Sequence, residues 1–254
     1  MSVHSSLLLI ADIAGYTRFM RLHAVSLAHA HDVVSQLIES VIDAAGPELE
    51  LAKLEGDAAF FHRPLDGATA VGEAWNAARV AAIHSAFHRR AADLARNTLC
   101  PCDGCQQAGS LRIKLVGHLG EVAVRKIRRM TELAGVDVII VHRLLKVRVP
   151  MPEYLLMTAP LYRRIGADAV GPAEPVDVEL EGIGTAEGWV VDLGELASRT
   201  PDPAPALSWL RRLVRHARLT WRSMPYFLGR RKACDGFRNV EARARAVGGS
   251  PADA

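Results

Sequence analysis

Two aspartates that follow strand-like runs are the residues of this chain best suited to metal chemistry. Asp12 stands near the end of the apolar run 7–13, which breaks at once into Ala-Gly-Tyr-Thr, and Asp57 stands in a Gly-Asp turn between two short strand-like runs. If the two strands are neighbours in one sheet, both carboxylates project into one place, which suits a hard divalent cation and a polyphosphate. The alternative is that each aspartate only caps its turn.

A second group of residues with ligand chemistry is a run of three cysteines. Cys100, Cys102 and Cys105 have the spacing Cys-x-Cys-x-x-Cys, with a glycine that permits a tight turn. In a reducing compartment such thiols favour a metal over a disulfide, so the spacing predicts a structural Zn²⁺. Reduced cysteines packed in a loop are the alternative. The fourth ligand stays open among nearby histidines and two more distant side chains: His84, His88, His118 and Cys234.

Length and composition indicate one globular domain with extensions, since the chain has 254 residues and half of them are apolar. The first six residues form no basic region, and the apolar run 7–11 is too short for a signal peptide or a membrane span. A cytoplasmic location is therefore expected.

The positive charge of the chain is concentrated near its C-terminus. Residues 201–254 contain eleven Lys or Arg and four Asp or Glu, a net +7, so the first 200 residues carry −4 within an overall +3. Because the body is mildly acidic, a nucleic-acid partner is not expected.

The elements that must position these residues alternate between helix and strand patterns. Apolar residues three and four apart predict helices over 26–45 and 68–97. Alternation predicts a hairpin of strands 111–116 and 121–124 with its turn at Gly120. Segment 135–146 is apolar enough for a strand or a buried helix. The later segments indicate a strand at 154–157, a helix at 159–165, and strands at 176–180 and 188–193. This order indicates an α/β sandwich with a mostly antiparallel sheet.

Four blocks in this order resemble the catalytic domain of class III nucleotidyl cyclases. They are Asp-Ile-Ala-Gly-Tyr-Thr at 12–17, Lys-Leu-Glu-Gly-Asp at 53–57, His-Leu-Gly-Glu-Val at 118–122, and the pair Gly135 and Arg143. The resemblance implies an α+β fold, a ferredoxin-like sandwich of the nucleotidyl cyclase type. The cysteine loop and the segment 141–146 also resemble a bacterial branch of cyclase-like proteins labelled as a domain of unknown function.

The resemblance implies a two-ion metal site. Asp12 and Asp57, together with the backbone carbonyl of Ile13, would hold two Mg²⁺ or Mn²⁺ ions. One ion would lower the pKa of the ribose 3′-hydroxyl, and the other would neutralise the triphosphate.

The resemblance also implies a nucleotide and a homodimer. Lys53 and Glu132 would face one edge of the base, which favours ATP over GTP, and Arg143 would stabilise charge in the transition state. That family builds its site across a head-to-tail homodimer, with the metal aspartates from one protomer and the base-binding residues and arginine from the other. The alternatives are a solvated Lys53, a surface Glu132, and an Arg143 that pairs with a carboxylate.

The chain departs from the family pattern at two groups that assist catalysis. Ile139 stands where the family has an asparagine that orients the ribose, and a branched alkane forms no hydrogen bond. Ile183 replaces the triphosphate-binding lysine, with Glu181 nearby, and a carboxylate repels a triphosphate. Since losing one such group costs on the order of a hundredfold in rate, efficient cyclisation is not expected. His118 is interpreted as a buried structural histidine.

The expected domains are a cyclase-like domain at 5–197 with a Cys-rich insert at 100–109, a Pro-rich linker at 198–207, a basic amphipathic extension at 208–246, and a disordered tail at 247–254. The extension carries seven Arg and one Lys within 208–232, with no acidic residue. It suits a membrane surface or an acidic protein partner. The alternative is a helix docked on the acidic body through its apolar stripe.

Three functions from different classes fit these features. The first is a divergent cyclase that binds metal-ATP, with weak or altered cyclase activity. The second is an inactive homologue that binds nucleotide and signals through changed partner contacts. The third is a scaffold in which the zinc and the basic extension matter and the aspartate pair is vestigial.

Overall fold

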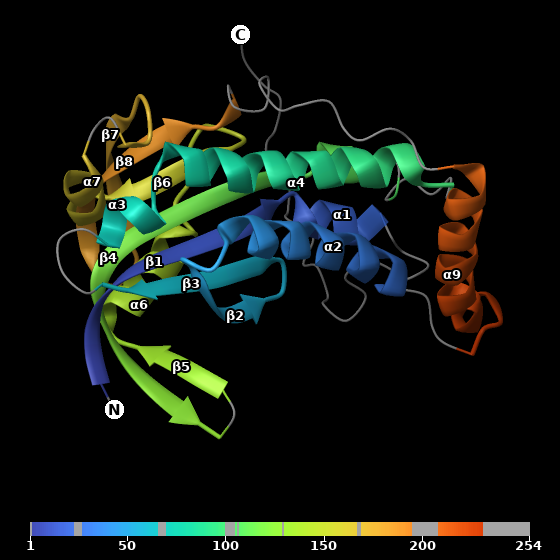
Figure 1. Cartoon of the computed structure of the whole chain (residues 1–254), viewed down its shortest axis with the longest axis horizontal. Helices are drawn as coiled ribbons and strands as arrows, with labels where there is room; N and C mark the ends of the chain where they lie inside the picture. The colour runs from blue at the N-terminus through green and yellow to red at the C-terminus, as the bar shows by residue number, and fades with distance from the viewer. Residues whose placement is uncertain are drawn as a thin grey trace, which may run out of the picture.

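The N-terminal strand lies at the centre of a single sheet (Figure 1). The computed structural model describes residues 2–22, 27–65, 70–99, 105, 107–128, 130–166, 169–194 and 208–230. Strand β1 (Ser2–Ala14) pairs antiparallel with β3 (Ala58–Pro64) on one side and with β4 (Arg112–Ile127) on the other. The strand order is β2-β3-β1-β4-β6-β8-β7, with β5 paired to β4.

The remaining strands complete a mostly antiparallel sheet. They are β2 (Glu50–Glu55), β5 (Met130–Ala134), β6 (Tyr154–Thr158), β7 (Glu174–Leu180) and β8 (Gly184–Asp192). Among the described strands, only β4 and β6 pair in parallel. The sequence-based expectation of an α+β fold with a mostly antiparallel sheet is confirmed.

Helices cover both faces of the sheet. Successive side chains of β1 point to opposite sides, and because those on both sides are apolar, each face needs a covering layer. Leu7 and Leu9 are buried on the face covered by α2 (Leu27–Ala45) and α4 (Ala77–Asn97), which lie side by side in Figure 1. Leu8 and Ile10 are buried on the other face, with α6 (Val136–Leu144). The smaller helices are α1 (Tyr16–Leu22), α3 (Ala70–Ala74), the 3₁₀ helix η1 (Ala108–Ser110) and α7 (Ala159–Ile165).

Several predicted elements are confirmed. The predicted helices at 26–45 and 159–165 are α2 and α7, and the predicted strand at 154–157 is β6. The predicted strands at 176–180 and 188–193 correspond to β7 and β8. Segment 135–146, which periodicity left open between strand and helix, contains α6.

The prediction of one continuous helix over 68–97 is wrong. Helix α3 ends at Ala74, and α4 begins at Ala77 after an extended Asn76. The Asn76 side-chain oxygen accepts a hydrogen bond from the Arg79 N–H at 3.0 Å. This N-cap satisfies a backbone donor that would otherwise lack a partner, so a new helix starts there.

The predicted turn at Gly120 is also wrong. Strand β4 runs without interruption through Gly120 to Ile127, and its antiparallel partner β5 begins only at Met130. A Cβ atom at Gly120 would lie 2.1 Å from Cγ of Asp137 on α6. The glycine therefore permits a close approach between strand and helix, a second common reason for glycine inside a strand.

We expect Gly120→Ala to lower the free energy of unfolding by about 1–3 kcal/mol, because the added methyl group overpacks the contact with Asp137. Chemical denaturation measures the change. Gly72→Ala is the matched control, since a Cβ there meets no atom within 4 Å. Equal stability of the Gly120→Ala variant and the parent chain would contradict the proposed close approach.

The predicted domain limits fall mostly outside the described residues. This is the case for the linker at 198–207 and the tail at 247–254, and the extension is described only to residue 230, where it forms α9 (Trp209–Phe227). None of the described helices combines the length and the apolar character needed to cross a membrane.

Candidate functional site

The sheet brings Asp12, Ile13 and Asp57 together. Asp12 lies opposite Ala58 in the β1–β3 register, and the backbone N–H of Ile13 donates to the Asp57 carbonyl at 3.2 Å. Asp57 occupies the turn between β2 and β3, so both carboxyl groups lie at one end of adjacent strands. The expectation that the strands before Asp12 and after Asp57 are neighbours in one sheet is confirmed.

The two carboxyl groups influence each other electrostatically. The pKa of Asp12 is raised to about 6, chiefly by burial and secondly by the charge of Asp57, while the Lys114 ammonium opposes the shift. Burial also raises the pKa of Asp57, while its own backbone N–H and Lys114 lower it. A bound cation would relieve the repulsion between two partly buried carboxylates, because it favours their charged forms.

Lys114 is a basic residue at this site that the sequence did not single out. It lies directly opposite Asp12 in the β1–β4 register, and its Nζ is 5.9 Å from the ring centroid of Tyr154. Burial, with the charge of Asp12 as a smaller cause, raises the pKa of Tyr154. The alternation of 111–116 placed Lys114 on a strand, but only the register shows which residue faces it.

Lys53 and Glu132 line one hollow, although they lie on different strands. Phe60 and His142 line it as well. Lys53 Nζ is paired with Glu55 Oε1 at 3.2 Å, and His142 Nε2 lies 3.1 Å from Glu55 Oε2. The hollow therefore offers a hydrogen-bond donor, Lys53, and an acceptor, Glu132. The ammonium of Lys53 is already paired with the Glu55 carboxylate of the same chain.

Arg143 pairs with Glu181. The arginine is in the last turn of α6, and Glu181 is in the turn between β7 and β8. Ile139 and Ile183, the two residues that depart from the class III cyclase pattern, are exposed. The alternative in which the arginine pairs with a carboxylate is thus the arrangement found.

A buried histidine anchors the helix that carries Arg143. His118 lies 2.8 Å from the Thr158 hydroxyl through Nδ1 and 2.9 Å from Asp137 Oδ1 through Nε2. Burial lowers the pKa of His118, although Asp137 opposes this shift. The other carboxylate oxygen of Asp137 accepts from the Glu121 N–H at 2.7 Å. The expectation that His118 is buried is confirmed.

The described part of the cysteine loop contains one predicted ligand. Cys100, Cys102 and the candidate Cys234 lie outside the described residues. Cys105 is buried, and its Sγ is 3.1 Å from Nε2 of His29. Of the histidines considered from the sequence, His84 and His88 instead face Glu153, so the sequence missed the histidine beside this thiol.

Helix α9 contacts α2, and Arg212 Nη2 donates to the Thr98 carbonyl at 3.5 Å (Figure 1). Several apolar side chains among the described residues of α9 are exposed and are not buried against the body. The exposed residues include Trp209, Leu210, Leu213, Val214 and Trp221.

Comparisons with known proteins give a family and a fold. A family model described as "Protein of unknown function (DUF2652)" matches residues 34–154. The uncharacterized protein Rv2561/Rv2562 of Mycobacterium tuberculosis is 42% identical over 207 residues, which cover 82% of this chain and 94% of that protein.

Two solved structures show the same arrangement of elements. The guanylyl cyclase Cya2 has a TM-score of 0.55 at 14% identity, covering 76% of this chain and 95% of its own. The guanylate cyclase domain of RhGC from Catenaria anguillulae, in complex with GTP, has a TM-score of 0.54 at 15% identity, covering 76% and 99%. At such identities these likenesses establish the fold alone.

Proposed function

This chain belongs to the family of the Mycobacterium tuberculosis protein Rv2561/Rv2562 and has the class III nucleotidyl cyclase fold, and from this premise we propose that it binds a metal complex of a nucleoside triphosphate. The observation that carries the proposal is the pair Asp12 and Asp57 at adjacent strand ends, with the pKa of each carboxyl raised. The structural neighbour from Catenaria anguillulae holds GTP, which supports a nucleotide as ligand.

Asp12 and Asp57 would hold Mg²⁺ or Mn²⁺, because hard cations prefer carboxylate oxygens. Bound there, the ions would neutralise the triphosphate and make the ribose hydroxyl more acidic. Lys114 supplies an ammonium beside the pair. We propose that it contacts a phosphate, in place of the lysine that Ile183 replaces.

Lys53 and Glu132 would contact the base, since both line one hollow. We propose ATP rather than GTP as the nucleotide, as the resemblance to class III cyclases implies for this lysine. Lys53 must then exchange its Glu55 partner for the base. The exposed apolar side chains of Val136 and Ile139 on α6 support a homodimer in which a second copy completes the site.

The Arg143–Glu181 ion pair favours a second candidate function, nucleotide binding without turnover. An arginine neutralised by a carboxylate of its own chain is less available to a phosphoryl group. The first candidate remains a cyclase with weak or altered activity.

Incubating the purified chain with ATP and Mn²⁺ separates the two candidates when cyclic AMP and bound nucleotide are measured independently. Product that disappears in Asp57→Asn supports the cyclase. Bound nucleotide without product supports the binding module. Absence of both would overturn the proposed function, and a chain that sediments as a monomer at micromolar concentration would contradict the shared site.

We expect Mn²⁺ affinity to fall as the pH drops below about 6, because a proton on Asp12 competes with the metal and its pKa is about 6. The loss should approach tenfold per pH unit well below this pKa. Isothermal titration of Mn²⁺ at several pH values measures it. Lys114→Gln should move the inflection to higher pH, because Lys114 lowers the pKa of Asp12. Affinity that does not vary with pH would contradict Asp12 as a ligand.

A further inference from the structure

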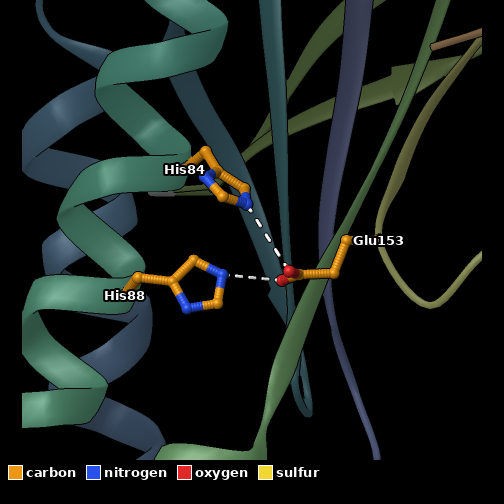
Figure 2. Close-up of side chains that lie close together, drawn as sticks. All are labelled: His84, His88 and Glu153. Atoms are coloured by element: carbon orange, nitrogen blue, oxygen red, sulfur yellow. Dashed lines mark hydrogen bonds and ion pairs between the residues drawn. The ribbon is translucent and has the colours of Figure 1, made fainter. Parts of the chain in front are cut away.

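A cluster of two histidines and one glutamate lies apart from the acidic pair, between α4 and the sheet (Figure 2). His84 and His88 are one turn apart on α4, and Glu153 immediately precedes β6. The distance from His88 Nε2 to Glu153 Oε1 is 2.7 Å, and that from His84 Nε2 to Glu153 Oε2 is 3.6 Å. The three candidate ligand atoms all lie within 4.8 Å of one another.

The cluster is nearly closed to solvent. The side chain of His84 is fully buried, that of Glu153 is 3% exposed and that of His88 is 16% exposed. Neither ring nitrogen of His84 has a hydrogen-bond partner within the described part of the chain. Nε2 of His84 faces Oε2 of Glu153 at 3.6 Å, an ion-pair distance that is too long for a good hydrogen bond, so a closer partner at this buried nitrogen would be favourable.

The carboxylate of Glu153 is held from two further sides. The backbone N–H of Ile113 donates to Oε1 at 3.0 Å, which fixes the carboxylate relative to β4. The Arg112 Nε lies 4.0 Å from Oε2, on a side chain that is 41% exposed. This long contact is weak, and an exposed guanidinium can turn toward water when a cation approaches. Glu153 therefore remains available as a ligand.

We propose that His84, His88 and Glu153 bind a divalent transition-metal ion, and that Zn²⁺ is the fitting ion. Two imidazoles and one carboxylate form a donor set that zinc accepts, whereas Mg²⁺ prefers oxygen ligands alone. A cation between the three side chains would bind Nε2 of His84 directly, in place of its long contact with Glu153. The ion would connect α4 to the start of β6 and, through Ile113, to β4.

This site differs from the other two candidate metal sites of the chain. The acidic pair offers oxygen ligands only, and the cysteine loop would bind metal through sulfur. Cobalt(II) separates the three, because thiolate ligands add charge-transfer absorption in the near ultraviolet and a tetrahedral nitrogen and oxygen site shows visible bands without it. The inference is independent of nucleotide binding.

The test uses the full chain, stripped of metal and titrated with Co²⁺ and then Zn²⁺. His88→Gln removes a proposed ligand. His62→Gln is the matched control, because His62 is also a buried histidine beside a glutamate, with its Nε2 3.6 Å from Glu50, and no cluster with a second histidine forms around it among the described residues. We expect His88→Gln to abolish the visible bands without thiolate character and to weaken Zn²⁺ binding by about a hundredfold.

The His62→Gln variant should keep both signals. The unmodified chain alone also tests the proposal, so a variant that fails to fold does not remove the test. Visible bands that lack thiolate character in the unmodified chain support the site. Their absence there, or their persistence in folded His88→Gln, would show a hydrogen-bonded buried cluster that binds no metal.

Discussion

Asp57→Asn is expected to weaken Mn²⁺-dependent ATP binding by about a hundredfold or more, since even outer-shell changes at metal sites cost 10–100-fold. The substitution keeps the size of the side chain and its ability to accept a backbone hydrogen bond, but removes one negative charge. Equilibrium dialysis with labelled ATP measures the affinity. Asp43→Asn, at an exposed position on α2, is the matched control and should leave binding unchanged.

The same variant separates a metal site from a turn cap. Burial, and secondly the charge of Asp57, raises the pKa of Asp12 to about 6, so the metal-free native state loses stability as the pH rises from about 4 through 6. Removing that charge should therefore raise the melting temperature of the metal-free chain at neutral pH. A turn cap alone predicts a nearly unchanged melting temperature, because asparagine caps a turn as well as aspartate does, together with unchanged ATP binding.

Ile139→Asn combined with Glu181→Gln is expected to raise the rate of cyclic AMP formation by roughly a hundredfold or more, as each change restores a group of the kind that contributes about a hundredfold. The asparagine supplies a hydrogen-bonding side chain at the position where class III cyclases have the asparagine that orients the ribose. The glutamine removes the carboxylate that pairs with Arg143. Ile139 is 52% exposed, so the fold should tolerate the exchange.

Ile127→Asn is the control for the first change, because Ile127 is an isoleucine that is 53% exposed, much like Ile139, but lies on β4 outside the catalytic pattern of class III cyclases. It should leave the product level unchanged. If the double variant binds ATP and still forms no cyclic AMP, then Ile139 and Glu181 do not account for the missing activity. A different part of the site would then be incomplete.

Local signals in the sequence predicted much of this fold. Helix 26–45 carries a complete apolar stripe, and Gly-Asp at 56–57 is a short-range turn signal, so neither depends on distant residues. The proximity of Asp12 and Asp57 was predicted from such strand-end and turn signals, together with the sequence blocks that resemble class III cyclases. These predictions were correct because strand ends and tight turns are encoded within a few residues.

The sequence was uninformative where two distant segments meet. The sequence predicts a turn at Gly120. The actual reason for this glycine, its close packing against Asp137, depends on a helix later in the chain and leaves no local signal. Lys114 became part of the site only through the strand register. His84 and His88 were considered as ligands for the cysteines, whereas their partner Glu153 is 65 residues beyond His88. A three-residue cluster of this kind leaves no periodic trace in the chain.

Binding of ATP with and without Mn²⁺ tests the central claim most directly. The purified full chain is titrated with ATP in Mn²⁺ and, separately, in a chelator. The proposal predicts saturable binding that requires Mn²⁺ and weakens sharply when the metal is removed. Equal binding under both conditions, or none in either, would contradict a metal-nucleotide site at Asp12 and Asp57.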